Sequence, residues 1–128
     1  MDLRWPLRIE EERCDGVIVV TLTGRLGAAS AVPFGARLAE AISRGNARMV
    51  IDLQGVDYIS SAGLAALAAA ASLCARSQGM LVLCGLTDPV RIALDLGGLL
   101  SEFPVEPSRE QAVARVAAPS ASSPADQG

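Results

Sequence analysis

The chain has 128 residues, of which 51% are hydrophobic and 3% aromatic, and its net charge is −3. This length fits one domain, whose core must be aliphatic. The absence of histidine and lysine excludes histidine-based catalysis and metal ligation, Schiff-base chemistry and a P-loop lysine, while the acidic balance without a basic block argues against nucleic acid as a partner.

The first segments predict a β-hairpin. Residues 7–13 begin with alternating apolar and charged residues, residues 14–16 (Cys-Asp-Gly) are a turn signal, and residues 17–23 are rich in β-branched residues. The acidic triplet at residues 10–12 has two interpretations, a partner patch or the solvated part of an edge strand. We favour the edge strand, because charged residues commonly protect strand edges.

A helix and a buried strand are expected next. Ser30 can cap the helix, Pro33 fits its first turn, and Gly45 is a suitable stop. Residues 49–53 (MVIDL) form a short, nearly continuous apolar run, which is typical of a strand covered on both faces. We expect residues 54–59 to be a loop.

The second half of the chain alternates helices with strands. Ser60 or Ser61 opens a second helix that runs to about Ser77, and residues 80–84 (MLVLC) predict another buried strand. Asp88 followed by proline is typical of a helix start, and this third helix should end at residues 97–98, both glycine.

The last ordered elements are short. An extended piece is expected around residues 103–105, and Ser108 should cap a final helix. From Ala117 onward the chain is rich in serine, proline and small residues, which predicts disorder.

This order of elements predicts an α/β fold in one domain over residues 1–116, followed by a disordered tail over residues 117–128. Alternating strands and helices imply right-handed crossovers and a central, mostly parallel sheet. We expect four to five strands, beginning with the hairpin, and about four helices.

Cysteine usage and the terminal segment indicate the compartment. Cys14, Cys74 and Cys84 are far apart and odd in number, so we expect buried free thiols in a reducing compartment and neither a disulfide framework nor a zinc site. The first 13 residues lack a signal-peptide core, and the longest mainly apolar run, residues 62–75, is too short to span a bilayer. We therefore expect a cytoplasmic protein without membrane insertion or cofactors.

The most informative stretch is residues 50–67, VIDLQGVDYISSAGLAAL. Asp52 interrupts an apolar strand near its expected C-terminal end, where ligands collect in open α/β sheets. Ser60 and Ser61 follow at a helix N-terminus, which offers unpaired N–H groups and a partial positive charge to a phosphate. Spacing alone favours simple capping. A serine hydrolase is excluded, because neither serine has the glycine two residues before it that a nucleophile elbow needs, and no histidine base exists.

The helix that follows leaves two questions open. Gly63 stands where alanine would favour the helix, which indicates either close approach of another backbone or a tight loop-to-helix junction. We expect a buried stripe at Leu64, Leu67, Ala71 and Cys74. The remaining alanines suit a docking surface, or they reflect only the high helix propensity of alanine.

Taken together, these residues carry a family resemblance. The segments MVIDLQGVDYISSAGLAAL and GMLVLCGLTDPVRIALDLGGLLSEFPVEPSREQAV resemble the STAS domain of bacterial anti-sigma factor antagonists, as does the earlier VIVVTLTGRLGAASAVPFGARLAEAI. The resemblance covers residues 8–116. It implies partner switching: the unmodified antagonist binds a cytoplasmic anti-sigma factor that is a serine kinase, phosphorylation by that kinase releases it, and a phosphatase resets the system.

The resemblance also implies the site. The family pattern Asp-Ser-Ser/Thr-Gly-Leu, laid on this chain, puts the phosphoacceptor at Ser61. The partner-binding residues implied are Asp57, Ser60, Ser61, Ala62, Gly63 and Leu64. Two positions depart from the family: Ser60 replaces the usual aspartate, and Gly27 stands where an aspartate is frequent.

The sequence leaves a second function open. The chain could instead be a STAS accessory subunit of a transporter or other signalling assembly, without a phosphorylation switch. No catalytic constellation favours an enzyme, so both hypotheses describe a binding protein.

Overall fold

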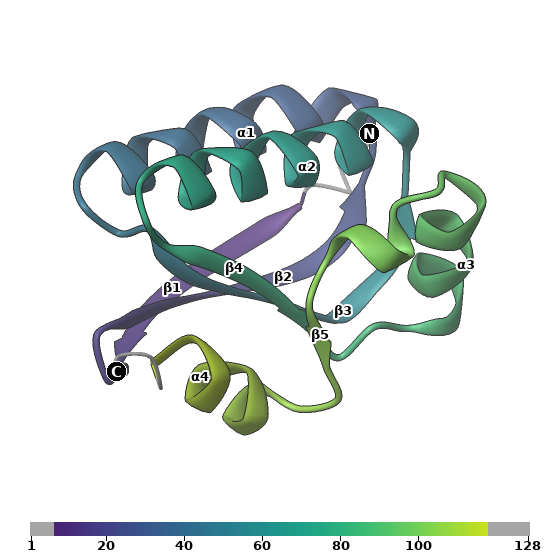
Figure 1. The fold of residues 1–128 in the computed structure, drawn as a ribbon. Helices are drawn as coiled ribbons and strands as arrows, with labels where there is room; N and C mark the ends of the chain where they lie inside the picture. Colours follow the sequence, from purple (N-terminus) through teal and green to yellow (C-terminus); the bar gives the residue numbers. More distant parts are fainter. Residues whose placement is uncertain (1–6, 118–128) are drawn as a thin grey trace.

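The computed structural model describes residues 7–117, which form a five-stranded sheet with helices on both faces (Figure 1). The strand order is β1-β2-β3-β4-β5; β1 is antiparallel to β2, and the other pairs are parallel. The elements are β1 (Arg8–Cys14), β2 (Val17–Leu26), α1 (Ala28–Ser43), β3 (Arg48–Ile59), α2 (Ser61–Arg76), β4 (Met80–Cys84), α3 (Asp88–Leu96), the 3-10 turn Leu100–Glu102, β5 (Val105–Glu106) and α4 (Arg109–Ala117). The predicted fold class is confirmed. Ala117, the first residue of the predicted tail, is the last residue of α4, and residues 118–128 lie outside the described residues.

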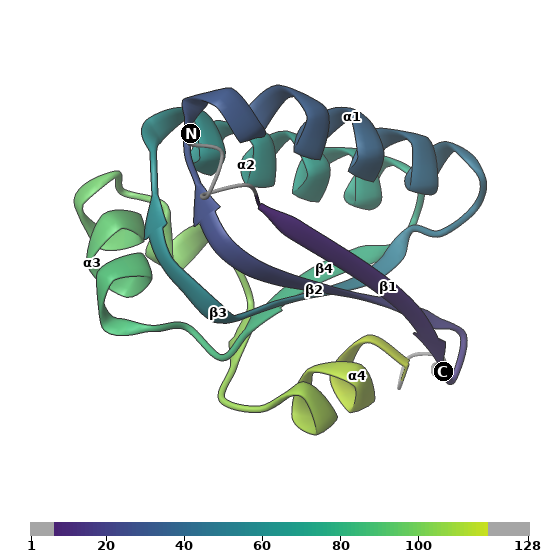
Figure 2. The ribbon, with the colours of Figure 1, turned by 180° about the vertical axis from the view of Figure 1, so that it is seen from behind.

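The two faces of the sheet are covered unequally. Helices α1 and α2 lie side by side over one face, α4 lies under the other, and α3 lies at the carboxyl end of the parallel strands (Figures 1 and 2). Each face of the sheet has its own hydrophobic cluster, because successive side chains of a strand point to opposite faces. In β2, Ile18, Val20 and Leu22 pack in the cluster beneath α1 and α2, whereas Val17 and Val19 pack against α4. The sheet is therefore the middle of three layers.

Strand β3 is longer than predicted. Residues 54–59 are not a loop; they continue the strand and pair with the second half of β2. The register shifts twice, because Thr21 and Thr23 pair with Asp52 and Gly55, and Gly24 and Arg25 pair with Val56 and Tyr58. Each shift adds one residue to β3, as in a β-bulge. The buried residues Leu53, Val56 and Ile59 therefore recur every third position, which hides the strand from a period-two pattern.

The start of helix α1 differs from the prediction. Helix α1 begins at Ala28 after the extended residue Gly27, whose carbonyl accepts from Ser30 and Ala31, so Ser30 lies inside the helix and does not cap it. Pro33 lies inside the helix beyond its first turn.

The N-cap of α3 lies one residue earlier than expected. Thr87 occupies the N-cap position, Asp88 is the first helical residue, and the Thr87 hydroxyl donates to the Val56 carbonyl at 2.7 Å. The predicted cap of α4 is confirmed, because the Gln111 amide donates to Ser108 Oγ at 3.2 Å. Over residues 7–117, no helix combines the length and apolar character that crossing a membrane requires.

Candidate functional site

Ser60 and Ser61 have different surroundings. Ser60 is the N-cap of α2: its Oγ accepts from the Gly63 amide at 3.1 Å, and its own amide donates to the Leu26 carbonyl at 2.9 Å. Ser61 is the first helical residue and is exposed, and its hydroxyl makes no hydrogen bond to any other residue in the described range 7–117. The capping role therefore belongs to Ser60, and the hydroxyl of Ser61 faces solvent.

Gly63 is required by close packing within this domain. A Cβ at this position would lie 2.9 Å from the Leu26 carbonyl oxygen, 2.8 Å from Leu26 Cγ and 3.0 Å from Ile59 Cγ1. The first turn of α2 therefore rests directly on the ends of β2 and β3. Because the Leu26 carbonyl also accepts from Ser60, the position of the serine pair is tied to the sheet.

The electrostatic setting of Ser61 is favourable for an anion. Helices α1 and α2 begin near each other at the carboxyl ends of β2 and β3 (Figures 1 and 2). The first N–H groups of each helix lack intrahelical acceptors and carry partial positive charge. Neither helix has an acidic residue in its first turn. An anion on Ser61 would therefore meet two positive helix ends and no carboxylate from either first turn.

Sequence reasoning missed an aromatic group beside this edge. Tyr58 is 41% exposed, and the Arg25 guanidinium carbon lies 4.4 Å from the centre of its ring, in cation–π geometry. A Cβ on Gly27 would lie 3.8 Å from Tyr58 Cε2, so the ends of β2 and β3 meet here. Tyr58 was assigned to a loop because the bulges hide the strand, although it is the only tyrosine in the chain. Asp57, the preceding residue, is exposed.

Helix α3 brings exposed apolar side chains to the same edge. Leu96 is 83% exposed and Ile92 is 56% exposed. The end of α3 contacts α2, because a Cβ on Gly97 would lie 3.3 Å from Leu64 Cδ1. These residues could have been found from the sequence, because Ile92 and Leu96 are two large apolar residues one turn apart in the predicted third helix.

The exposed face of α2 is made of small residues. The residues buried in α2 are Gly63, Leu64, Leu67, Ala70 and Cys74. Ala71, which was predicted in the buried stripe, is only half-buried, and Ala70 takes its place. Ala62, Ala65 and Ala69 are exposed, so a smooth alanine surface runs from Ser61 along the helix.

Asp52 does not belong to this edge. It lies in the middle of β3 and is only 6% exposed. Its carboxylate accepts from the Gln54 amide at 3.0 Å and from Arg109 Nη2 at 3.2 Å. The same Nη2 donates to Thr21 Oγ1 at 2.7 Å, and Arg109 Nη1 donates to Glu12 at 3.1 Å. The prediction that Asp52 marks the end of its strand was wrong, and its contacts tie α4 to the sheet.

The pKa of Arg109 reflects these contacts. Burial acts to lower it, but the hydrogen bond and the charge of Asp52, together with the charge of Glu12, raise it above the ordinary value.

The cysteines are free thiols, but one of them is not buried. Cys14 is exposed at the end of β1, contrary to the prediction, whereas Cys74 and Cys84 are buried. Burial raises the pKa of Cys74 to about 11 and that of Cys84 to about 12, and the charge of nearby Asp52 adds to the shift at Cys84. Both buried thiols are therefore protonated at neutral pH. Among residues 7–117, no group of three His, Cys, Asp or Glu side chains is arranged to hold a metal ion.

Comparisons with known proteins agree on one family. The model of the STAS domain matches residues 8–112. A protein of Bordetella bronchiseptica named "Putative anti-sigma factor antagonist BtrV" is 40% identical over 108 residues, covering 84% of this chain and 93% of that protein. An anti-sigma factor antagonist from Mycobacterium paratuberculosis superimposes with a TM-score of 0.78 at 25% identity, over 86% of this chain and 93% of that one. The phosphorylated form of SpoIIAA from Bacillus has the same fold, with a TM-score of 0.67 at 18% identity, over 85% and 99% of the two chains.

Proposed function

The chain belongs to the STAS domain family, and from this premise we propose that it is an anti-sigma factor antagonist that binds an anti-sigma factor in the bacterial cytoplasm. It acts by binding and not by catalysis. The observation that carries the proposal is the exposed Ser61 hydroxyl at the start of α2, beside a cap that is already supplied by Ser60.

The switch that we propose is phosphorylation of Ser61 by an anti-sigma factor of the serine-kinase type. Phosphate adds about −1.5 to −2 charge at neutral pH. The two helix N-termini can accept that charge, and the Ser60 cap does not have to break, so the free domain stays folded. A partner covering this surface would instead have to desolvate a dianion, at a cost of about 3 kcal/mol or roughly a hundredfold in affinity.

The partner surface that we propose surrounds Ser61. It includes Asp57, Ser60, Ala62, Gly63 and Leu64, of which Gly63 and Leu64 are buried and contribute by shaping the first turn of α2. The exposed side chains of Ile92 and Leu96 extend it across α3. An apolar area beside a modifiable hydroxyl suits a complex that one charge can break.

The modification can be tested directly. The purified protein is incubated with its cognate anti-sigma kinase and ATP, and the phosphate is mapped by mass spectrometry. We expect one phosphate on Ser61, full loss of incorporation in Ser61→Ala, and retained incorporation in Ser60→Ala. A phosphate found on Ser60 would show that the wrong hydroxyl was chosen. A phosphatase that acts on this site should then restore the unmodified protein.

The proposed effect of a negative charge at Ser61 is tested by measuring binding to the anti-sigma factor. Ser61→Asp should weaken the complex with the anti-sigma factor, whereas Ser61→Ala should leave it intact. Ser72→Asp is the matched control, because Ser72 is exposed on the same helix three turns away. If neither kinase modification nor anti-sigma binding is found, the alternative stands: a STAS accessory subunit of a transporter or other assembly.

A further inference from the structure

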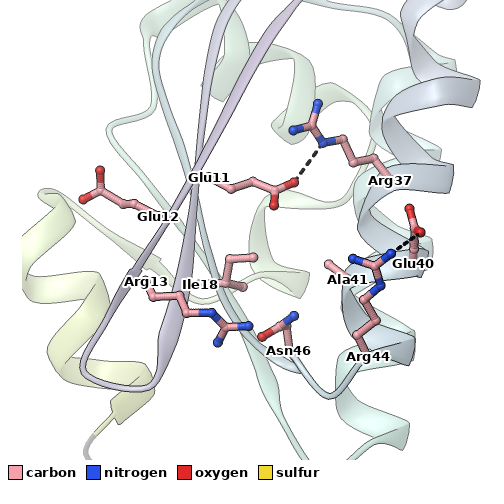
Figure 3. Close-up of a pocket in the computed structure, with 9 residues that line it drawn as sticks. All are labelled: Glu11, Glu12, Arg13, Ile18, Arg37, Glu40, Ala41, Arg44 and Asn46. Carbon is pink, nitrogen blue, oxygen red and sulfur yellow. Dashed lines mark hydrogen bonds and ion pairs between the residues drawn. The ribbon is translucent and has the colours of Figure 1, made fainter.

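A polar groove of about 710 Å³ (Figure 3) lies beside the β1–β2 hairpin, whereas Ser61 follows the carboxyl end of β3. One wall is the β1–β2 hairpin, and the other is the C-terminal half of α1 with Asn46. Helix α1 begins near Ser60 and runs away from it for 16 residues, which is about 24 Å of helix. A ligand in this groove would therefore not contact the serine site.

Three arginines line the groove. Arg37 Nε pairs with Glu11 at 2.8 Å, and Arg44 Nη2 pairs with Glu40 at 2.8 Å. Arg13 makes no ion pair or hydrogen bond to any other side chain of residues 7–117. In Figure 3, Arg13 extends from the hairpin toward the side chain of Asn46, whereas Arg44 runs along α1 and pairs with Glu40.

One positive charge in the groove has no ion-pair partner among residues 7–117. Glu12 also borders the groove, but its side chain points away from it and pairs with Arg109 (Figure 3). The groove is lined by three guanidinium groups and three carboxylates. Glu11 and Glu40 pair with Arg37 and Arg44, so Arg13 is the lining arginine without an ion pair among residues 7–117. We propose that this groove is a binding site for a small phosphorylated molecule, held by Arg13, Arg44 and Asn46.

A phosphoryl group fits better than a carboxylate. Any anionic ligand must compete with Glu40 for Arg44, since that pair already exists. A phosphoryl group carries about −1.5 to −2 charge and three acceptor oxygens, so it binds a guanidinium more strongly than the carboxylate of a glutamate does. The Arg44–Glu40 pair is weak, because both side chains are more than 60% exposed, at 71% and 61%.

The remaining geometry agrees with this ligand class. The carbonyls of residues 40–42, near the end of α1, accept hydrogen bonds from the amides of residues 44–46, so these three carbonyls are not free acceptors. Ile18 and Ala41 border the groove as apolar side chains. A volume of this size exceeds a single phosphoryl group and accommodates a small organic remainder against them.

Titration with pyrophosphate, followed by amide NMR and calorimetry, tests the proposal. We expect saturable shifts centred on Arg13, Arg44 and the Asn46 side chain, and binding about tenfold weaker in both Arg13→Gln and Arg44→Gln, as expected for the loss of one charged contact. Arg91→Gln is the matched control, since it removes the same charge from an exposed position on α3 and should not change the affinity.

A second pair of variants tests whether the affinity for pyrophosphate can also be increased. Glu40→Gln removes the competing carboxylate and should tighten pyrophosphate binding, whereas Glu102→Gln, exposed at a distant 3-10 turn, should not. Equal effects of groove and control variants would overturn the site, because they would indicate only a response to net charge. Malonate binding as tightly as pyrophosphate would overturn the phosphoryl preference.

Discussion

Arg109 Nη2 lies 3.2 Å from Asp52 Oδ2, and this ion pair joins the last helix to the centre of the sheet. The two residues are 57 positions apart in sequence. Asp52 is nearly inaccessible, while one third of the Arg109 side chain remains exposed. The guanidinium also contacts Thr21 and Glu12, so a single side chain connects α4 to β1, β2 and β3.

Removal of this guanidinium should destabilise the domain. Arg109→Gln leaves the buried carboxylate of Asp52 without its charged partner, and we expect a loss of about 1–3 kcal/mol in the free energy of unfolding. Urea denaturation measures it, with the exposed Arg91→Gln as control. Similar losses in both variants would show that the pair contributes nothing beyond an ordinary surface charge.

Two helical glycines should respond in opposite directions to alanine. Gly63→Ala inserts a methyl group 2.9 Å from the Leu26 carbonyl oxygen, and the resulting strain should exceed the gain in helix propensity, for a net loss of about 1–3 kcal/mol. At Gly35 the nearest atom, Ala66 Cβ, is 3.6 Å away, so Gly35→Ala should stabilise by up to about 1 kcal/mol. Thermal unfolding of both variants decides whether close packing is the reason for a glycine at position 63. Stabilisation by both substitutions would refute this explanation.

The two serines should differ in their effect on stability. Ser60→Ala removes the side-chain acceptor of the Gly63 amide and should cost about 1 kcal/mol. Ser61→Ala removes an exposed hydroxyl and should change the free energy of unfolding by less than about 0.5 kcal/mol. Chemical denaturation of both variants gives the comparison, and a larger loss for Ser61→Ala would contradict the assignment of the cap.

Alkaline pH should destabilise the fold through the buried thiols. The pKa of Cys74 rises from its ordinary value of 9.0 to about 11 because the thiol is buried. Between these values the unfolded chain releases a proton that the folded chain retains, so the free energy of unfolding falls as pH rises, by up to about 1.4 kcal/mol per pH unit for one thiol.

The slope of stability against pH isolates this effect. Cys74→Ala should have a shallower decline between pH 9 and pH 11 than the parent protein, whatever its stability at neutral pH. The chain has no lysine, so lysine deprotonation cannot obscure this window. Parallel profiles for the two proteins would mean that the thiol does not control the decline.

The apolar residues of α3 should matter for partner binding. On the proposed function, Leu96→Gln removes a side chain that is 83% exposed, and it should weaken the anti-sigma complex about tenfold without lowering the unfolding temperature. Ala114→Gln, exposed on α4 across the sheet, is the control for calorimetric titration. Unchanged affinity in Leu96→Gln would exclude α3 from the contact surface.

Much of the fold could be predicted because it depends on neighbouring residues. The β-branched run after Cys14-Asp15-Gly16 forms its hairpin, and both Asp15 and Gly16 have positive φ in that turn. The cap at Ser108 was found because an N-cap bonds a residue only three positions away. The second half of β3 was missed because its bulges depend on pairing with β2.

The sequence by itself determined the order of strands and helices and the presence of a serine pair at the start of α2, since periodicity and capping are local. Only the tertiary structure decided that Ser60 supplies the cap while the Ser61 hydroxyl faces solvent, and that Asp52 pairs with Arg109 of the last helix. It also brought Arg13 and Arg44 to one groove. Local rules could not decide these contacts, because each depends on how segments distant in the chain pack against the same sheet.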